Sequence, residues 1–365
     1  MTIKLGYIII NLSRIRLHKI LSYVGVKMAD VTIKDVAKRA GVSIATVSRV
    51  INNNYYVSPE IREKVLRAIE ELNYYPNSVA RSLKNDSTTH TIGFLVSDIS
   101  NNYFTIMAKA VEEVVHKEGY SLIVCSTNDV KKRELVYLKL LISKKVDGLI
   151  LNTTGENDDF IATLSERLPI VLVNRRVYNQ NFRGDFIDSD NIEGTYKLVT
   201  YLLSMGHRKI GVINGTLSVS TGRERFKGFE RAMSEVGIFV DESYPYRYDG
   251  DFTMESGYQG AAKMVNMHQK PSAIVIMNNV MAIGALKYFR ANNIRVPEDV
   301  SIVAYGNIDN SDLLYVQPTI VTLDPWSIGN KAGEMILERI KNRNMGNREV
   351  IFVPQLVEGN SVKKL

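Results

Sequence analysis

Hydrophobic positions follow two different periods along the chain. Between Val31 and Leu83 they recur at helical spacing in short stretches separated by turn residues. From Thr91 onward, short apolar runs alternate with longer amphipathic stretches. The pattern predicts a small all-helical unit followed by a larger α/β part in which strands and helices alternate.

The first predicted helix begins after Thr32, a plausible N-cap with Asp35 at the capping-box position. Its apolar stripe runs through Val36 and Ala37, and Gly41 ends it. A second short helix follows closely, because Ser43 can cap it. The close spacing predicts two helices joined by a tight turn.

The second helix is expected to bury Val47 and Val50 and to expose the opposite face, which carries Ile44, Ala45, Ser48 and Arg49. A third helix begins at Ser58 with a proline in its first turn, and its inner face consists of Ile61, Val65, Ala68, Ile69 and Leu72. This arrangement is that of a helix-turn-helix DNA reader. A purely structural three-helix module is the alternative.

The segment NYYPNSVARSLKND follows the third helix. Pro76 interrupts the helical pattern and Asn77 can cap a short new helix with Val79, Ala80 and Leu83 on one face. A helix this short is marginal alone and is expected to fold only when docked on a second copy and on DNA. An ordinary linker is the alternative.

The sequences DVAKRAGVSIATVSRVIN and NYYPNSVARSL, together with the alternating body behind them, resemble the lac and gal repressor family of bacterial transcription regulators. The resemblance implies direct base readout by Ile44, Ala45 and Arg49, and contacts to the DNA backbone by Thr32, Thr46, Ser48 and Asn52. It also implies a hinge helix with Asn77, Ala80 and Leu83, in which Leu83 wedges into the minor groove.

Charge supports a nucleic-acid-binding amino-terminal part. The net charge is +7, of which residues 1–27 contribute +5 and residues 28–89 contribute +2, so the rest of the chain is neutral. Such asymmetry fits a DNA-binding end on a neutral body.

Residues 1–27 carry five basic residues, no acidic residue and an apolar stretch too short to span a bilayer. A basic amphipathic membrane helix is one interpretation. We favour a mis-assigned start, with translation beginning at Met28. Residues 28–75 are then the helix-turn-helix domain and 76–90 the hinge segment.

The body, residues 91–365, is predicted to be an α/β ligand domain of the periplasmic-binding-protein-like type I fold, with two lobes and parallel sheets. We expect the N-lobe to comprise about 91–203 and 324–342, and the C-lobe 204–323 and 343–365. His207 is expected at the junction of the lobes. Cys125, the one cysteine, lies in the apolar run SLIVCST and is expected to be a buried strand residue.

Ligands of open parallel sheets bind beyond the carboxyl ends of the strands. In this chain those ends present Asp98, Phe104 in the following loop and helix, Arg175 and Gly306. The resemblance implies that Arg225 contacts the effector, with Asn278 opposite it and Phe252 as an aromatic wall. These side chains suit a sugar-like ligand.

Two departures from the family pattern affect the ligand. Asn279 stands where the family commonly has aspartate after Asn278, and Gly306 stands where an aspartate often follows the tyrosine. With Arg175 and Arg225 retained, we expect an electropositive cleft that accepts an acidic sugar or a sugar phosphate.

Other classes of function find less support. The sequence has no phosphate-binding glycine loop, no metal-binding His/Cys pattern and no recognisable nucleophile and base, so we expect neither an enzyme nor a cofactor or metal. An exported sugar-binding protein of a transporter is the main alternative. The expected partners are operator DNA, a sugar-like effector and a second copy of the chain in the cytoplasm, without a membrane; no residue pattern supports a phosphocarrier protein as corepressor.

Overall fold

The structure is a computed structural model that describes residues 31–52, 55–74 and 88–365, apart from the side chain of Asn52. The chain divides into two compact units, Met1–Asn85 and Asp86–Leu365.

The first unit has the three predicted helices, α2 (Ile33–Ala40), α3 (Ile44–Asn52) and α4 (Pro59–Glu71). They enclose a small core of buried residues: Val36, Ala37, Val47, Val50, Val65 and Ala68. Four of the five residues predicted for the inner face of α4 belong to this cluster or pack against it, and Ile61 does not. The helical period therefore identified nearly the whole core.

The second unit consists of two α/β lobes, each built on a six-stranded sheet. The N-lobe sheet has the order β11-β5-β4-β3-β1-β2 and is parallel throughout. Its strands are β1 (Thr91–Val96), β2 (Ser121–Ser126), β3 (Gly148–Leu151), β4 (Ile170–Val173), β5 (Asp185–Ser189) and β11 (Glu349–Phe352).

Helices cover both faces of the N-lobe sheet. Along β1, Phe94 packs in one cluster and its neighbour Leu95 in another, since successive strand residues point to opposite faces. The first cluster lies under α6 (Asn102–Lys117) and α13 (Pro325–Lys341), and the second under α7 (Lys131–Ser143) and α8 (Asp158–Ser165). Burial on both faces explains why these strands are continuous apolar runs in the sequence.

The C-lobe sheet has the order β12-β10-β9-β8-β6-β7, in which only β12 runs antiparallel to its neighbour. Its strands are β6 (Ile210–Asn214), β7 (Arg247–Asp249), β8 (Ala273–Ile276), β9 (Ser301–Tyr305), β10 (Thr319–Thr322) and β12 (Gln355–Val357). Its helices are α9 (Asn191–Ser204), α10 (Ser220–Ser234), α11 (Met254–Val265) and α12 (Asn279–Ala291).

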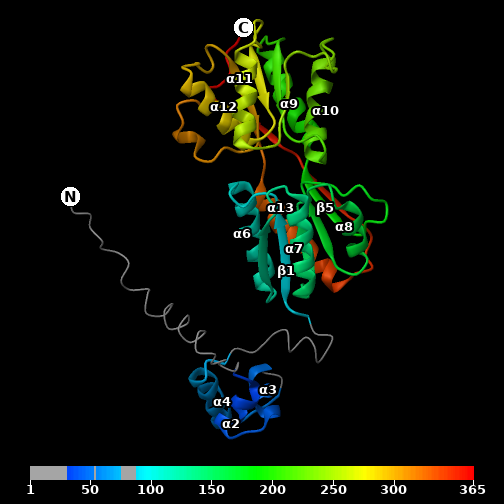
Figure 1. The fold of residues 1–365 in the computed structure, drawn as a ribbon, viewed down its shortest axis with the longest axis vertical. Coiled ribbons are helices and arrows are strands. Elements are labelled where there is room, and N and C mark those ends of the chain that lie inside the picture. The colour runs from blue at the N-terminus through cyan, green and yellow to red at the C-terminus, as the bar shows by residue number, and fades with distance from the viewer. Residues whose placement is uncertain (1–30, 53–54, 75–87) are drawn as a thin grey trace, which may run out of the picture. The chain divides into compact units, whose positions relative to one another are not determined.

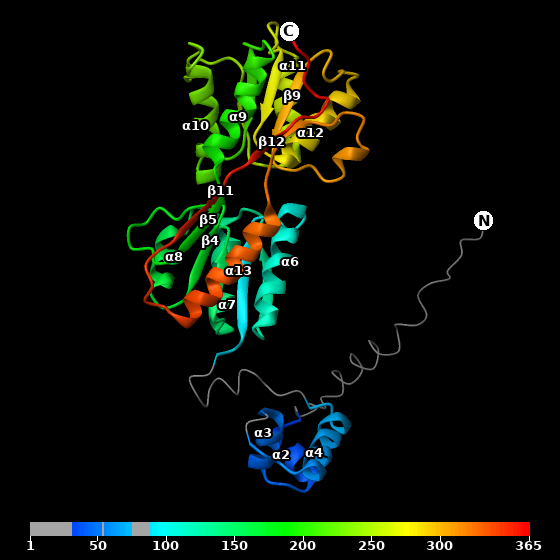
Figure 2. The same cartoon turned by 180° about the vertical axis from the view of Figure 1, so that it is seen from behind.

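The chain passes between the lobes three times, after β5, after β10 and after β11 (Figure 2). The predicted lobe boundaries at 203 and 342 are therefore wrong. Helix α9 packs on α10 in the C-lobe, so the first crossing lies near Asp190, and β11 pairs with β5, so the last lies near Val353. The alternation of strands and helices predicts that a helix follows each strand. It does not predict which of the two sheets that helix covers.

Two single-residue expectations also need correction. His207 is not at the lobe junction: it is fully buried within the C-lobe, just before β6, and its ring bonds Ser272 Oγ at 2.8 Å and the carbonyl of Lys363 at 3.1 Å. Cys125 lies on a strand as predicted but is only half-buried, because β2 is the edge of its sheet. Burial raises the pKa of its thiol.

Candidate functional site

Helix α2 of the helix-turn-helix is capped at both ends. The carboxylate of Asp35 accepts hydrogen bonds from the backbone N–H of Thr32 at 2.8 Å and from its hydroxyl at 2.7 Å. The same two bonds hold the pKa of Asp35 below its usual range. Gly41 then takes a left-handed conformation, with φ of 66°, which turns the chain toward α3 (Figure 1).

Helix α3 buries Val47 and Val50, as predicted, and turns its other face outward. Ile44 is 44% exposed although it is apolar, and Ala45 and Arg49 are exposed with it. An exposed isoleucine at the start of a short helix loses apolar burial, so this face is a candidate for contact with another molecule.

The side chains predicted to contact the DNA backbone differ in whether they already have hydrogen-bond partners within the protein. The Thr32 hydroxyl donates its proton to Asp35, and the Thr46 hydroxyl bonds Ser43 Oγ at 2.9 Å while its backbone N–H is capped by the same oxygen. Both hydroxyls are therefore already engaged in the free protein. Ser48 is half-buried on α3. The side chain of Asn52 and the hinge residues Asn77, Ala80 and Leu83 lie outside the described residues.

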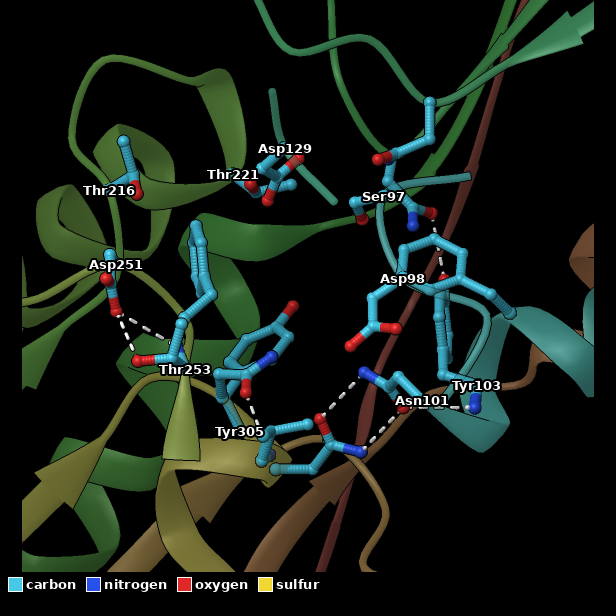
Figure 3. A pocket seen from close by; sticks show the side chains of 18 of the residues that line it. Ser97, Asp98, Asn101, Tyr103, Asp129, Thr216, Thr221, Asp251, Thr253 and Tyr305 are labelled. Atoms are coloured by element: carbon cyan, nitrogen blue, oxygen red, sulfur yellow. Dashed lines mark hydrogen bonds between the residues drawn. The ribbon is translucent and has the colours of Figure 1, made fainter. Parts of the chain in front are cut away.

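A cavity of about 620 Å³ lies between the two lobes of the second unit. All seven residues predicted from the sequence to bind the effector line it: Asp98, Phe104, Arg175, Arg225, Phe252, Asn278 and Gly306. They come from both lobes and from seven separate places in the chain. Figure 3 shows side chains from the two lobes facing one another across the cavity. That these residues contact an effector stays a prediction.

Arg175 is buried and held within the N-lobe. Its guanidinium makes a bidentate pair with the carboxylate of Asp129, at 2.5 and 3.0 Å, and donates to the carbonyl of Thr153 at 3.1 Å. Asp129 and its neighbour Asn128 both have φ of 53°, so a left-handed turn after β2 brings this carboxylate to the cavity. The positive charge of Arg175 is thus largely neutralised.

Arg225 is the corresponding cation of the C-lobe. It donates from Nε to Asn191 Oδ1 at 2.9 Å and from Nη1 to the carbonyl of Met277 at 2.7 Å, and its guanidinium stacks on the ring of Tyr305 at 3.9 Å. These contacts fix its orientation and leave Nη2 without a hydrogen bond among the described residues. A fork held in this way favours an oxygen-rich ligand.

Phe252 forms a wall between the two arginines, whose guanidinium carbons lie 5.6 Å (Arg175) and 5.9 Å (Arg225) from the ring centroid. Its φ is 66°, a rare conformation for a large side chain. The ring packs on Gly215, where an added Cβ would lie 2.0 Å from it. The backbone is therefore built to present this ring to the cavity.

Asn278 has fewer free hydrogen-bonding groups than an asparagine side chain usually offers. Its side-chain oxygen accepts from the N–H groups of Val280 at 2.8 Å and Met281 at 3.2 Å, which caps α12. Only its amide N–H groups remain for a ligand. The amino-terminal ends of α6, α10, α11 and α12 all lie at the cavity, since residues of their first turns or caps line it. Their dipoles add partial positive charge without adding cations.

The prediction of an electropositive cleft is wrong, because the charged side chains that line the cavity include more acids than bases. Asp98, Asp129 and Asp251 line the cavity together with only Arg175 and Arg225. The missing carboxylates at Asn279 and Gly306 are offset by the turn after β2, which supplies Asp129. Asp251 is also tied locally, because it accepts from Thr253 and Ser256.

A buried acid lies behind Arg225 at the first crossing between the lobes. Asp188 accepts from Asn191 Nδ2 at 2.7 Å, and the same amide also donates to Glu224 at 3.0 Å. Burial raises the pKa of Asp188 to about 8, against the attraction of Arg225. This carboxyl group is therefore largely protonated at neutral pH.

Direct contacts join the lobes around the cavity. The side chains of Asn101 and Asn279 exchange hydrogen bonds of 3.4 and 3.2 Å (Figure 3). Asn102 Nδ2 donates to Asp309 at 3.0 Å. On another side, the N–H of Arg176 donates to Ser220 Oγ at 3.0 Å. These hydrogen bonds join the N-lobe to the C-lobe.

Sequence reasoning missed Asp129 and Asn152, which also line the cavity. Asn152 directly follows β3 and Asn128 and Asp129 follow β2, so the strand-end rule could have identified both.

Within the described ranges, no helix is long and apolar enough to cross a membrane. Over the same ranges, no cluster of three or more His, Cys, Asp or Glu side chains is suited to a metal.

Comparison with known proteins places both units. Residues 32–77 match the bacterial regulatory proteins of the lacI family, and residues 89–357 match the periplasmic binding proteins and sugar binding domain of the LacI family. The HTH-type transcriptional repressor PurR of Photobacterium profundum is 38% identical over 338 residues, covering 92% of this chain and 99% of that protein. PurR of Haemophilus influenzae is 36% identical, with the same coverage.

Solved structures show the same fold. The lac repressor dimer bound to operator and the anti-inducer ONPF has a TM-score of 0.77 at 27% identity, covering 92% of this chain and all of that one. The complex of the transcriptional regulator CelR with cellobiose has a TM-score of 0.68 at 27% identity, covering 91% and 99%. The predicted fold class, a helix-turn-helix unit with a type I periplasmic-binding-protein-like unit, is confirmed. The chain belongs to the lacI family of bacterial regulatory proteins, which bind DNA and regulate transcription.

Proposed function

We propose that this protein is a repressor that binds a pseudo-palindromic operator as a homodimer and is switched by a small neutral, hydroxyl-rich effector. The relatives it resembles are repressors, and the lac repressor binds its operator as a dimer. A regulator of chromosomal genes acts in the cytoplasm, and the relatives give no reason to assign it catalysis.

The observation that carries the proposal is the cavity between the lobes, with Arg175 and Asp98 on one side and Arg225 and Phe252 on the other. A ligand that bridges the two sides stabilises the closed arrangement more than the open one, and this difference in affinity is what shifts a two-state equilibrium. Asn101 and Asn279 bond across the two lobes, so we expect this pair to separate when the lobes open.

Charge and shape support a neutral ligand. Arg175 is already paired with Asp129, and Asp98 is exposed to the cavity, where it would repel a second carboxylate. Hydroxyl groups suit Asp98 as acceptor and Arg225 and Asn278 as donors. The ring of Phe252 can stack on the apolar face of a sugar. A planar heterocycle would also stack there, which makes it the comparison ligand.

On DNA, Ile44 and Ala45 can make only apolar contacts, such as one with a thymine methyl group, while Arg49 can form a fork with guanine. Thr32, Thr46, Ser48 and Asn52 are proposed to position the DNA backbone, and Asn77, Ala80 and Leu83 to form a hinge helix that opens the minor groove.

The test selects operator DNA from a random pool with the full chain and then repeats binding with matched neutral sugars, sugar acids and nucleobases. We expect one pseudo-palindromic sequence, whose affinity changes only with ligands of the neutral hydroxyl-rich set. The direction of that change shows whether the effector induces or co-represses. Selection of no sequence, or a response to sugar acids alone, contradicts the proposal.

A further inference from the structure

Two exposed tyrosines directly follow the proposed recognition helix. The side chain of Tyr55 is 70% exposed and that of Tyr56 is 90% exposed. The next residue, Val57, packs against the small core of the first unit, whereas neither tyrosine belongs to it. Their rings therefore contribute little to the stability of this unit.

Among the described residues, the Arg49 side chain has one ring contact and no ion pair, and this ring contact is with Tyr55. Its guanidinium carbon lies 5.6 Å from the ring centroid. Two other arginines of the unit pair with carboxylates: Arg39 lies 2.6 Å from Glu71, and Arg67 pairs with Glu63. Arg49 thus differs from them in the chemistry of its partner.

This difference matters for DNA binding. A carboxylate would neutralise the guanidinium and occupy the N–H groups that a base or phosphate requires. An aromatic ring contacts the face of the guanidinium and leaves its edge donors available. It also restricts a long side chain that otherwise loses rotamer entropy when it binds.

We propose that Tyr55 is a positioning residue for Arg49: its ring holds the guanidinium in the orientation that reads the operator. The inference rests on the proposed function, since it assumes that Arg49 reads a base. The hydroxyl of Tyr55 has no part in it, because the contact is with the ring. Tyr56 has the same side chain but no contact with Arg49, so it serves as a matched control within the chain.

The experiment uses the full chain and the operator selected with the wild-type protein, with single base-pair changes across one half-site. We compare Arg49→Lys, Tyr55→Phe, Tyr55→Leu, Tyr55→Ser, Tyr56→Leu and the double variant Arg49→Lys/Tyr55→Leu. Binding is measured by fluorescence anisotropy, and thermal unfolding of each variant checks that it folds.

We expect Tyr55→Leu and Tyr55→Ser to weaken operator binding by about fivefold. They should lose discrimination at the same base pair as Arg49→Lys, and the double variant should discriminate no worse than Arg49→Lys alone. Tyr55→Phe and Tyr56→Leu should keep the wild-type discrimination.

Additive effects of the Arg49 and Tyr55 changes would overturn the inference, as would a loss in Tyr55→Leu that is equal for every base pair. A loss in Tyr55→Phe as large as in Tyr55→Leu would do the same, because the hydroxyl would then be the contact. If wild-type protein selects no operator, the proposed function fails and the inference fails with it.

Discussion

The two units hold their functional side chains in opposite ways. In the helix-turn-helix unit, Ile44 and Arg49 lie on the surface, over a core of six buried residues. In the ligand unit, Arg175 and Arg225 are buried, and each is held by partners on its own lobe. The proposed ligand site is therefore preorganised, whereas we expect the proposed DNA-reading face to acquire most of its contacts only from DNA.

This difference separates the consequences of substitution. A change on the exposed face of α3 should alter operator affinity with little cost in stability, because few contacts are lost. A change at a buried arginine of the cavity alters ligand binding and also leaves its partners without a bond. Substitutions in each unit test whether these consequences are separate.

Arg225→Lys should lower effector affinity by about a hundredfold, because lysine cannot reproduce the fork that bonds Asn191, Met277 and the ligand. Calorimetric titration measures the loss. Arg231→Lys, on the exposed side of the same helix, is the control and should bind as the wild type does. Equal affinities of the two variants would show that Arg225 does not contact the effector.

Val47→Ala should destabilise the first unit by about 2 kcal/mol, since Val47 is fully buried in a small core. Hydrogen exchange in residues 33–72 should become about thirtyfold faster, while exchange in residues 91–357 stays unchanged. Val275→Ala removes the same group from the larger C-lobe core. If Val47→Ala also accelerates exchange in the ligand unit, the two units are not energetically separate.

Arg49→Ala should weaken operator binding by about tenfold, the usual cost of losing one good base contact. Its thermal unfolding should match that of the wild type, because the side chain is exposed. Anisotropy and calorimetry on the same sample check operator and effector together. A fall in effector affinity would contradict the expectation that substitutions on α3 affect operator binding alone.

Asp188→Asn should change how stability depends on pH. The pKa of Asp188 is raised from its usual 3.8 to about 8, so between these values the folded protein holds a proton that the unfolded chain releases. The release of this proton on unfolding lowers the free energy of unfolding as pH rises from about 4 to 8. The variant should lose less stability over this range in urea denaturation than the wild type and the surface control Asp312→Asn. Identical slopes would exclude the raised pKa.

The sequence predicted the two units unequally, for physical reasons. The capping residues Thr32 and Asp35 and the turn at Gly41 depend on neighbours within one or two turns of helix, and the helical period alone identifies Val47 as inward-facing, so the local pattern was sufficient. In the ligand unit, strand ends and the family resemblance identified all seven proposed effector residues as cavity lining. The charge balance of the cavity could not be predicted in the same way, because it depends on the pairing of Asp129 with Arg175, which are 46 residues apart in the sequence.

The lobe boundaries failed for a related reason. β11 is a short, half-exposed strand that pairs with β5, at positions more than 150 residues away. No periodicity in the sequence encodes such a partner. Register and crossing points depend on the tertiary structure, and the sequence rules address them only through short connections.

The most direct test of the account measures operator affinity, with and without effector, for the wild type, Arg49→Ala and Arg225→Lys side by side. We predict that Arg49→Ala binds the effector normally but the operator weakly, whereas Arg225→Lys binds the operator normally and no longer responds to the effector. Loss of effector binding in Arg49→Ala, or an unaltered effector response in Arg225→Lys, would contradict a repressor that reads DNA with one unit and its ligand with the other.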